Sequence, residues 1–167
     1  MNSIKLCFLV LSFTFILGTN TLASSNIIPD RIIYDGNSYP LSGLPMEKYF
    51  AKFPNKRPKI ESFSTATQTG YVATLEFVEN ELFLKDFQLV VGFGTIGKSI
   101  LSELFPDDKK LKVDWLDQVI FNIGKGVQIE KGVFINDKKI VIDLIDGKIS
   151  KLKEFVYNSK TKEFVEK

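Results

Sequence analysis

The chain has 167 residues, and its formal net charge at pH 7 is +2. It contains no histidine and a single cysteine, Cys7, which lies in the N-terminal segment. The rest of the chain therefore excludes nucleophilic catalysis by Cys or Ser–His pairs, zinc or copper sites built on His or Cys, and disulfides. The nearly neutral charge also argues against a dedicated nucleic-acid-binding protein. We expect no metal, no cofactor and no nucleic-acid partner.

Residues 1–25 have the three parts of a secretory signal peptide. Lys5 is their only charged residue, residues 6–17 are almost entirely apolar, and small residues around Ala23 offer cleavage sites. The apolar run is shorter than the roughly 20 residues that cross a bilayer comfortably. We predict an exported protein, periplasmic or extracellular, that contacts a membrane only through this segment if it stays uncleaved. Residues 26–167 then form one domain, long enough for a proper core.

The domain is expected to open with a small β-hairpin. Two short apolar runs flank Asp35-Gly36-Asn37, and Asp-Gly between such runs is a strong turn signal. Pro40 has no N–H to donate, so its strand should end there or lie at an edge. After it, residues 46–53 fit a short helix with Tyr49, Phe50 and Phe53 facing inward.

A basic cluster surrounds Lys56 and Arg57 in the Pro-rich stretch that follows. Beside Phe53 and Phe63 it is a candidate surface for an anionic ligand. The alternative, which we favour, is a solvated loop whose aromatic side chains anchor it to the core.

Residues 70–92 predict two long strands folded back on each other. Alternating apolar residues run through both arms, and Asn80 in the turn readily takes a positive φ. The apolar positions change from even, Leu82 and Leu84, to odd, Phe87 and Leu89. This change indicates a β-bulge or a bend near Lys85-Asp86.

Gly92, Gly94 and Gly97 fit the spacing G-x-G-x-x-G, with a strand before them and a possible helix over residues 98–105. This spacing occurs in dinucleotide-binding loops, which need a βαβ unit in a parallel sheet. The surrounding segments read instead as antiparallel hairpins. We therefore interpret the glycines as a flexible turn, and a nucleotide-dependent enzyme remains a third alternative.

Trp115 lies between two carboxylates, Asp114 and Asp117, in a segment of alternating apolar residues. A Trp flanked by carboxylates can form a sugar platform with acid and base partners. The alternative is a core Trp with solvated aspartates on the polar face of a strand. Asp114 and Asp117 are thus the candidate catalytic residues, and Trp115, Lys56 and Arg57 the candidate ligand-binding residues.

The last third of the chain predicts further hairpins. Turns are expected at residues 124–126, at Asn136-Asp137 and at Asp146-Gly147. The expected fold is α+β and mostly antiparallel β, a meander of about eight strands with one or two short helices.

Several short segments together resemble a family of small uncharacterised bacterial proteins. They include the Asp-Gly hairpin, the Gly-Tyr-Val-Ala-Thr strand from Gly70, the Leu-Phe-Pro step before Asp107 and the Val-Asp-Trp sequence ending at Trp115. In that family an aromatic, a small hydroxyl residue and a glycine tend to follow Asp-Trp, whereas Leu116, Asp117 and Gln118 follow here. The resemblance implies an α+β or mostly β fold and carries no established activity.

Together these observations favour an exported, non-catalytic binding or interaction protein, inhibitor-like in character, whose partner is another envelope or extracellular protein or a glycan. The hypothesis depends on the missing acid/base motifs and on strand edges that can accept another strand. The alternative is a carboxylate-based hydrolase of an envelope glycan that uses Asp114 and Asp117.

Overall fold

The computed structural model describes residues 27–60, 67–91, 95–106 and 110–167, so the predicted signal peptide lies outside the described residues. The helices are α1 (Pro45–Lys52), a 3-10 turn η1 (Pro54–Lys56) and α2 (Leu101–Leu104). The strands are β1 (Arg31–Tyr34), β2 (Asn37–Ser42), β3 (Tyr71–Val78), β4 (Glu81–Val91), β5 (Thr95–Ser99), β6 (Leu111–Lys112), β7 (Gln118–Glu130), β8 (Val133–Ile145), β9 (Lys148–Asn158) and β10 (Glu163–Glu166).

In the described part of the chain these strands form one ten-stranded sheet in the order β10-β9-β8-β7-β2-β1-β3-β4-β5, with β6 beside β4. Among the described pairings only β1 with β3 is parallel. The expected α+β fold with mainly antiparallel strands is confirmed. The expected number of strands was about eight; the described residues form ten, because the short strands β6 and β10 pair separately.

The first two predicted hairpins are present. In the turn between β1 and β2, Asp35 and Gly36 have φ angles of 50° and 71°, as a two-residue hairpin turn requires. In the central hairpin Thr74 pairs with Asp86 but Leu75 pairs with Leu84, which leaves Lys85 as the extra residue of a bulge. The bulge predicted from the shift in apolar positions is confirmed.

Two predictions for the second half of the chain are wrong. Residues 124–126 and 136–137 are not turns, because they lie inside the long strands β7 and β8. The glycine-rich stretch forms a bulge in β7, since the register shifts between Ile123 and Gly126.

The helix expected over residues 98–105 begins only at Leu101, because the residues before it form β5, which pairs antiparallel with β4. This arrangement contradicts a dinucleotide-binding loop, although Gly92 and Gly94 themselves lie outside the described residues.

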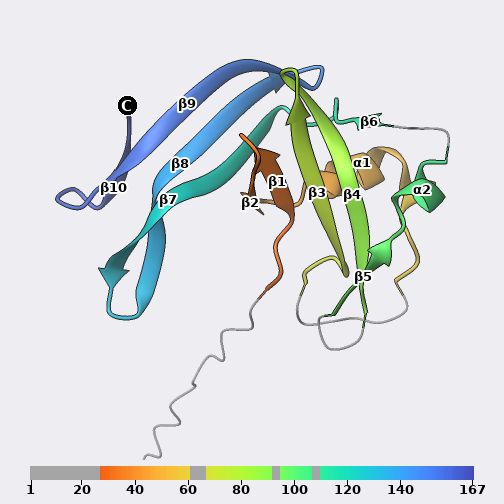
Figure 1. The fold of residues 1–167 in the computed structure, drawn as a ribbon, viewed down its shortest axis with the longest axis horizontal. Helices are drawn as coiled ribbons and strands as arrows, with labels where there is room; N and C mark the ends of the chain where they lie inside the picture. Colours follow the sequence, from red (N-terminus) through yellow and green to blue (C-terminus); the bar gives the residue numbers. More distant parts are fainter. Residues whose placement is uncertain (1–26, 61–66, 92–94, 107–109) are drawn as a thin grey trace, which may run out of the picture.

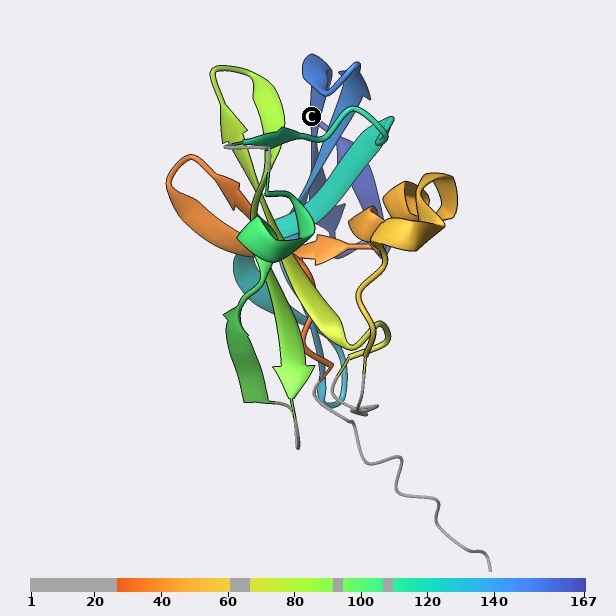
Figure 2. The same ribbon diagram turned by 90° about the vertical axis from the view of Figure 1, so that its right-hand side faces the viewer.

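The sheet curls so that two hairpin ends meet. Glu81 of β4 pairs with Lys148 of β9, and the Leu82 N–H donates to the Gly147 carbonyl at 2.8 Å. Helix α1 packs into the curl with Met46 and Phe50 buried, whereas Phe53, expected to face inward, is exposed because the helix ends at Lys52. Figures 1 and 2 show both helices at the β3 to β6 end of the molecule.

The buried core lies between the curled sheet and α1. Its largest fully buried side chains are Tyr71, Phe50, Phe87, Phe121, Ile32, Met46, Leu75, Leu82 and Ile142. We call the part of the molecule built around them the body.

The strands β7 to β10 continue past the body. Figure 1 shows their far ends projecting away from both helices. We call this extension the arm; it comprises residues 122–139, from β7 through its turn into β8, and residues 155–167, from β9 through its turn into β10 and on to Lys167. Apart from Ile123, none of its apolar side chains belongs to or packs against the described core cluster.

Candidate functional site

Trp115 is packed against the helix rather than presented to solvent. Its indole N–H donates to the Pro45 carbonyl at 2.9 Å, and its ring centroid lies 4.6 Å from that of Tyr49. The side chain is half-buried and contacts the hydrophobic core. Its hydrogen-bonding group is therefore already used within the protein, and its ring contacts Tyr49.

The two aspartates beside Trp115 are exposed. Asp117, with 88% of its side chain accessible, forms an ion pair with Lys48 at 2.7 Å. The hydrogen bond from Lys48 lowers the pKa of Asp117 below its ordinary value. A glycosidase acid needs the opposite, a raised pKa in a partly enclosed site. The hydrolase hypothesis stays a prediction, and these contacts give it no support.

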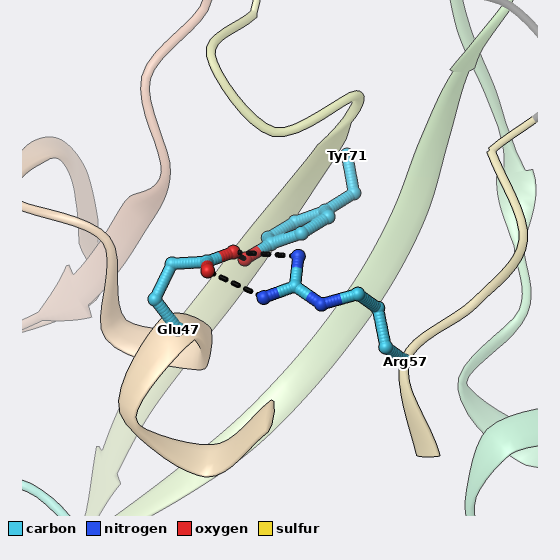
Figure 3. A network of polar contacts seen from close by, with 3 residues as sticks. All are labelled: Glu47, Arg57 and Tyr71. Atoms are coloured by element: carbon cyan, nitrogen blue, oxygen red, sulfur yellow. Dashed lines mark hydrogen bonds and ion pairs between the residues drawn. The ribbon is translucent and has the colours of Figure 1, made fainter. Parts of the chain in front are cut away.

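Lys56 and Arg57 are both exposed, but Arg57 also has partners within the protein. The Arg57 guanidinium donates to both carboxylate oxygens of Glu47, with N–O distances of 3.0 and 2.5 Å, and the Tyr71 hydroxyl donates to Glu47 Oε1 at 2.8 Å (Figure 3). The bonds from Arg57, with a smaller contribution from Tyr71, lower the pKa of Glu47. Burial, reinforced by the hydrogen bond to Glu47, raises the pKa of Tyr71.

This network connects three separate segments. Glu47 lies in the first turn of α1, Arg57 follows η1, and Tyr71 begins β3. Arg57 also lies 5.0 Å from the centroid of the Phe50 ring, in a cation–π contact. Since each charged group already has its partner, the network fixes the segment after α1 against the sheet.

A cavity of about 170 Å³ lies beside this network, lined in part by Asp30, Leu41, Leu44, Thr69 and Tyr71. Asp30 is only 5% exposed. Its Oδ1 accepts a hydrogen bond from the Ala73 N–H at 2.7 Å, whereas Oδ2 is buried without a partner among the described residues. Burial raises the pKa of Asp30 to about 6.

Sequence reasoning missed Asp30, Glu47 and Tyr71 as a group. The alternation of apolar residues placed Tyr71 only on the buried face of a strand, and nothing local connects it with Glu47. Signals for Asp30 were equally weak, because its partner Ala73 is 43 positions away.

Two further properties of the described residues bear on function. Within the described ranges, no three acidic, His or Cys side chains gather closely enough to hold a metal ion. Neither described helix has the length and apolar character needed to cross a bilayer.

The arm carries apolar side chains on the face of the sheet opposite the core. Directly paired residues of antiparallel strands share a face. Val127 pairs with Ile135, Phe155 with Lys139, and Phe164 with Tyr157, so these six lie on the face opposite core-facing Ile140. We call Val127, Ile135, Lys139, Phe155, Tyr157 and Phe164 the aromatic face of the arm.

Contacts within the aromatic face hold its side chains in place. The rings of Tyr157 and Phe164 meet edge to face at 5.6 Å, and Lys139 Nζ lies 4.3 Å from the centroid of Phe164. The arm contains seven lysines and four acidic residues, so it carries a net positive charge. The aromatic face thus combines apolar side chains, ordered by ring contacts, with charged neighbours of both signs, since Asp137 and Glu166 lie on the same face as Lys139.

No protein-family model matches the chain, and neither the curated proteins nor the solved structures include a significant match to it.

Proposed function

We propose that this protein is an exported, non-catalytic interaction protein that uses the aromatic face of the arm to bind another exported protein. The observation that carries the proposal is that this face brings apolar side chains from four strands together, outside the described core cluster. Contiguous apolar patches of this kind mark protein interaction sites. Export is supported by the signal-like residues 1–25.

The chemistry of the arm indicates the character of the partner. Aromatic side chains are enriched among the residues that dominate binding energy, and Tyr157 and Phe164 supply two of them. The net positive charge of the arm favours an acidic surface with exposed apolar groups. Affinity for such a partner should fall as the salt concentration rises, because exposed charges are screened.

The proposal is tested by capture from envelope extract, followed by measurement of affinity for the purified captured protein. Phe164→Ser removes a ring from the aromatic face, and we expect a loss of affinity of at least about 30-fold. Phe134→Ser is the matched control, because Phe134 is exposed on the same arm but its side chain lies on the opposite face.

Equal losses for both variants, or no loss for Phe164→Ser, would contradict the assignment of the binding face. Retention of a cell-wall glycan that is abolished by Trp115→Ala would instead favour the hydrolase alternative. Both variants should melt at nearly the temperature of the wild type, since neither side chain is buried in the core.

A further inference from the structure

Strand β10 lies at one end of the sheet and pairs, among the described residues, with β9 alone. In an antiparallel pair, residues alternate between hydrogen-bonded and non-hydrogen-bonded positions. The Lys167 N–H donates to the Glu154 carbonyl at 2.9 Å, so this pair and the Val165–Val156 pair are the hydrogen-bonded ones. The backbone groups of the intervening residues, Phe164 and Glu166, therefore point away from β9.

The order of charges in β10 allows it to pair with itself. Residues 162–167 read Lys-Glu-Phe-Val-Glu-Lys. When two copies run antiparallel with Val165 opposite Val165, Phe164 lies opposite Glu166 and Glu163 opposite Lys167. Phe164 and Glu166, whose backbone groups point away from β9, then lie opposite each other across the two strands. This is the condition for four new backbone hydrogen bonds. The opposite charges of Glu163 and Lys167 face each other across the strands and stabilise the pairing at both ends.

Neighbouring registers do not meet both conditions. With Phe164 opposite Val165, Glu163 lies opposite Glu166, and an outward-pointing residue meets an inward-pointing one. With Phe164 opposite itself, Glu166 lies opposite Lys162, whose φ of 59° takes it out of extended conformation. Backbone geometry and charge thus select the same register.

We propose that two copies of this chain associate through their β10 edges, antiparallel, with Val165 on the two-fold axis. Val165 is 50% exposed and shares a face with its partner Val156. The pairing forms a row of four valines across the interface and joins the two arms into one continuous sheet. Figure 1 shows β10 on the far side of the molecule from α1 and α2, so neither helix obstructs the approach.

A four-residue edge buries little surface, so the dimer is expected to be weak and dependent on concentration. This self-association is independent of the proposed function, because it uses the backbone edge of β10 rather than the aromatic face.

Sedimentation velocity of the full chain over a concentration series tests the inference. Glu166→Pro removes an outward-pointing N–H without affecting the ladder to β9, and proline is tolerated at such edge positions. Glu166→Ala is the matched control, because it removes the same side chain and keeps the N–H. We expect the wild type and Glu166→Ala to dimerise, and Glu166→Pro to remain monomeric with its thermal unfolding unchanged.

Charge reversal tests the register. Glu163→Lys and Lys167→Glu should each weaken the dimer about tenfold, because both symmetric pairs then bring like charges together. Their combination should restore dimerisation, since the opposite charges have only exchanged places. A wild type that stays monomeric into the millimolar range, dimerisation of Glu166→Pro equal to the wild type, or no restoration in the double variant would overturn the inference.

Discussion

The body and the arm are built from the same strands but differ in what covers them. In β8, Ile140 and Ile142 are buried in the core. Phe134 lies on the same face, six positions before Ile140, but is 65% exposed. Pairing between β7 and β8 continues through both regions. The backbone ladder therefore extends strands well beyond the point where packing ends, and the uncovered part is available for other contacts.

This difference implies different energetic roles for similar side chains. A buried ring contributes through the area it removes from water and through close contacts with its neighbours. A ring on an uncovered sheet contributes little to folding, whatever its chemistry. Stability measurements should therefore separate the two regions.

The largest expected effect is in the core. Phe121 is fully buried, with Tyr34 and Tyr39 rings 5.3 and 5.6 Å away. Phe121→Ala should lower the free energy of unfolding by about 4 kcal/mol, because it leaves a cavity. Phe134→Ala in the arm should cost less than about 0.5 kcal/mol. Urea unfolding of both variants measures the contrast, and similar losses would show that the arm is part of the folding core.

The next largest effect concerns pH and the buried carboxyl of the body. The pKa of Asp30 is raised from its ordinary 3.8 to about 6, so between these values the folded chain binds more protons than the unfolded chain. The stability that this group contributes is therefore fully present below its ordinary pKa of 3.8 and is lost as the pH rises through about 6. Asp30→Asn keeps an acceptor for the Ala73 N–H but has no charge to bury.

Urea unfolding of the wild type and Asp30→Asn at several pH values measures this contribution. Between pH 4 and 7 the stability of Asp30→Asn should improve relative to the wild type by about 2 kcal/mol. Carboxylates with lowered pKa values, such as Glu47, act in the opposite direction but are common to both proteins. A difference that is constant with pH would show that Asp30 stays charged in the folded protein.

Short-range features of the fold could be predicted from the sequence. Turn residues such as Asp35-Gly36 and Asp146-Gly147 act through their own backbone preferences, and both pairs have positive φ. The bulge at Lys85 was visible because it reverses which positions face inward. Such signals involve residues only a few positions apart.

Long-range features could not be predicted in the same way. The parallel pairing of β1 with β3 and the bond from Tyr71 to Glu47 depend on how distant segments meet. The arm posed a different problem. The alternation of apolar residues continues beyond the core, and no local signal marks where the covered part of the sheet ends. Gly124 and Gly126 were therefore interpreted as a turn, whereas they lie in a bulge of β7.

The smallest expected effect separates two turn glycines. Gly147 and Gly132, with φ of 73° and 81°, lie at opposite ends of β8. A Cβ at Gly147 would lie 2.7 Å from the Val113 carbonyl oxygen, whereas one at Gly132 would meet nothing within 4 Å. Gly132→Ala should therefore cost only the left-handed strain, about 1 kcal/mol, and Gly147→Ala at least about 2 kcal/mol. Equal thermal destabilisation would show that Val113 can move aside and that the closure of the body near Gly147 is loose.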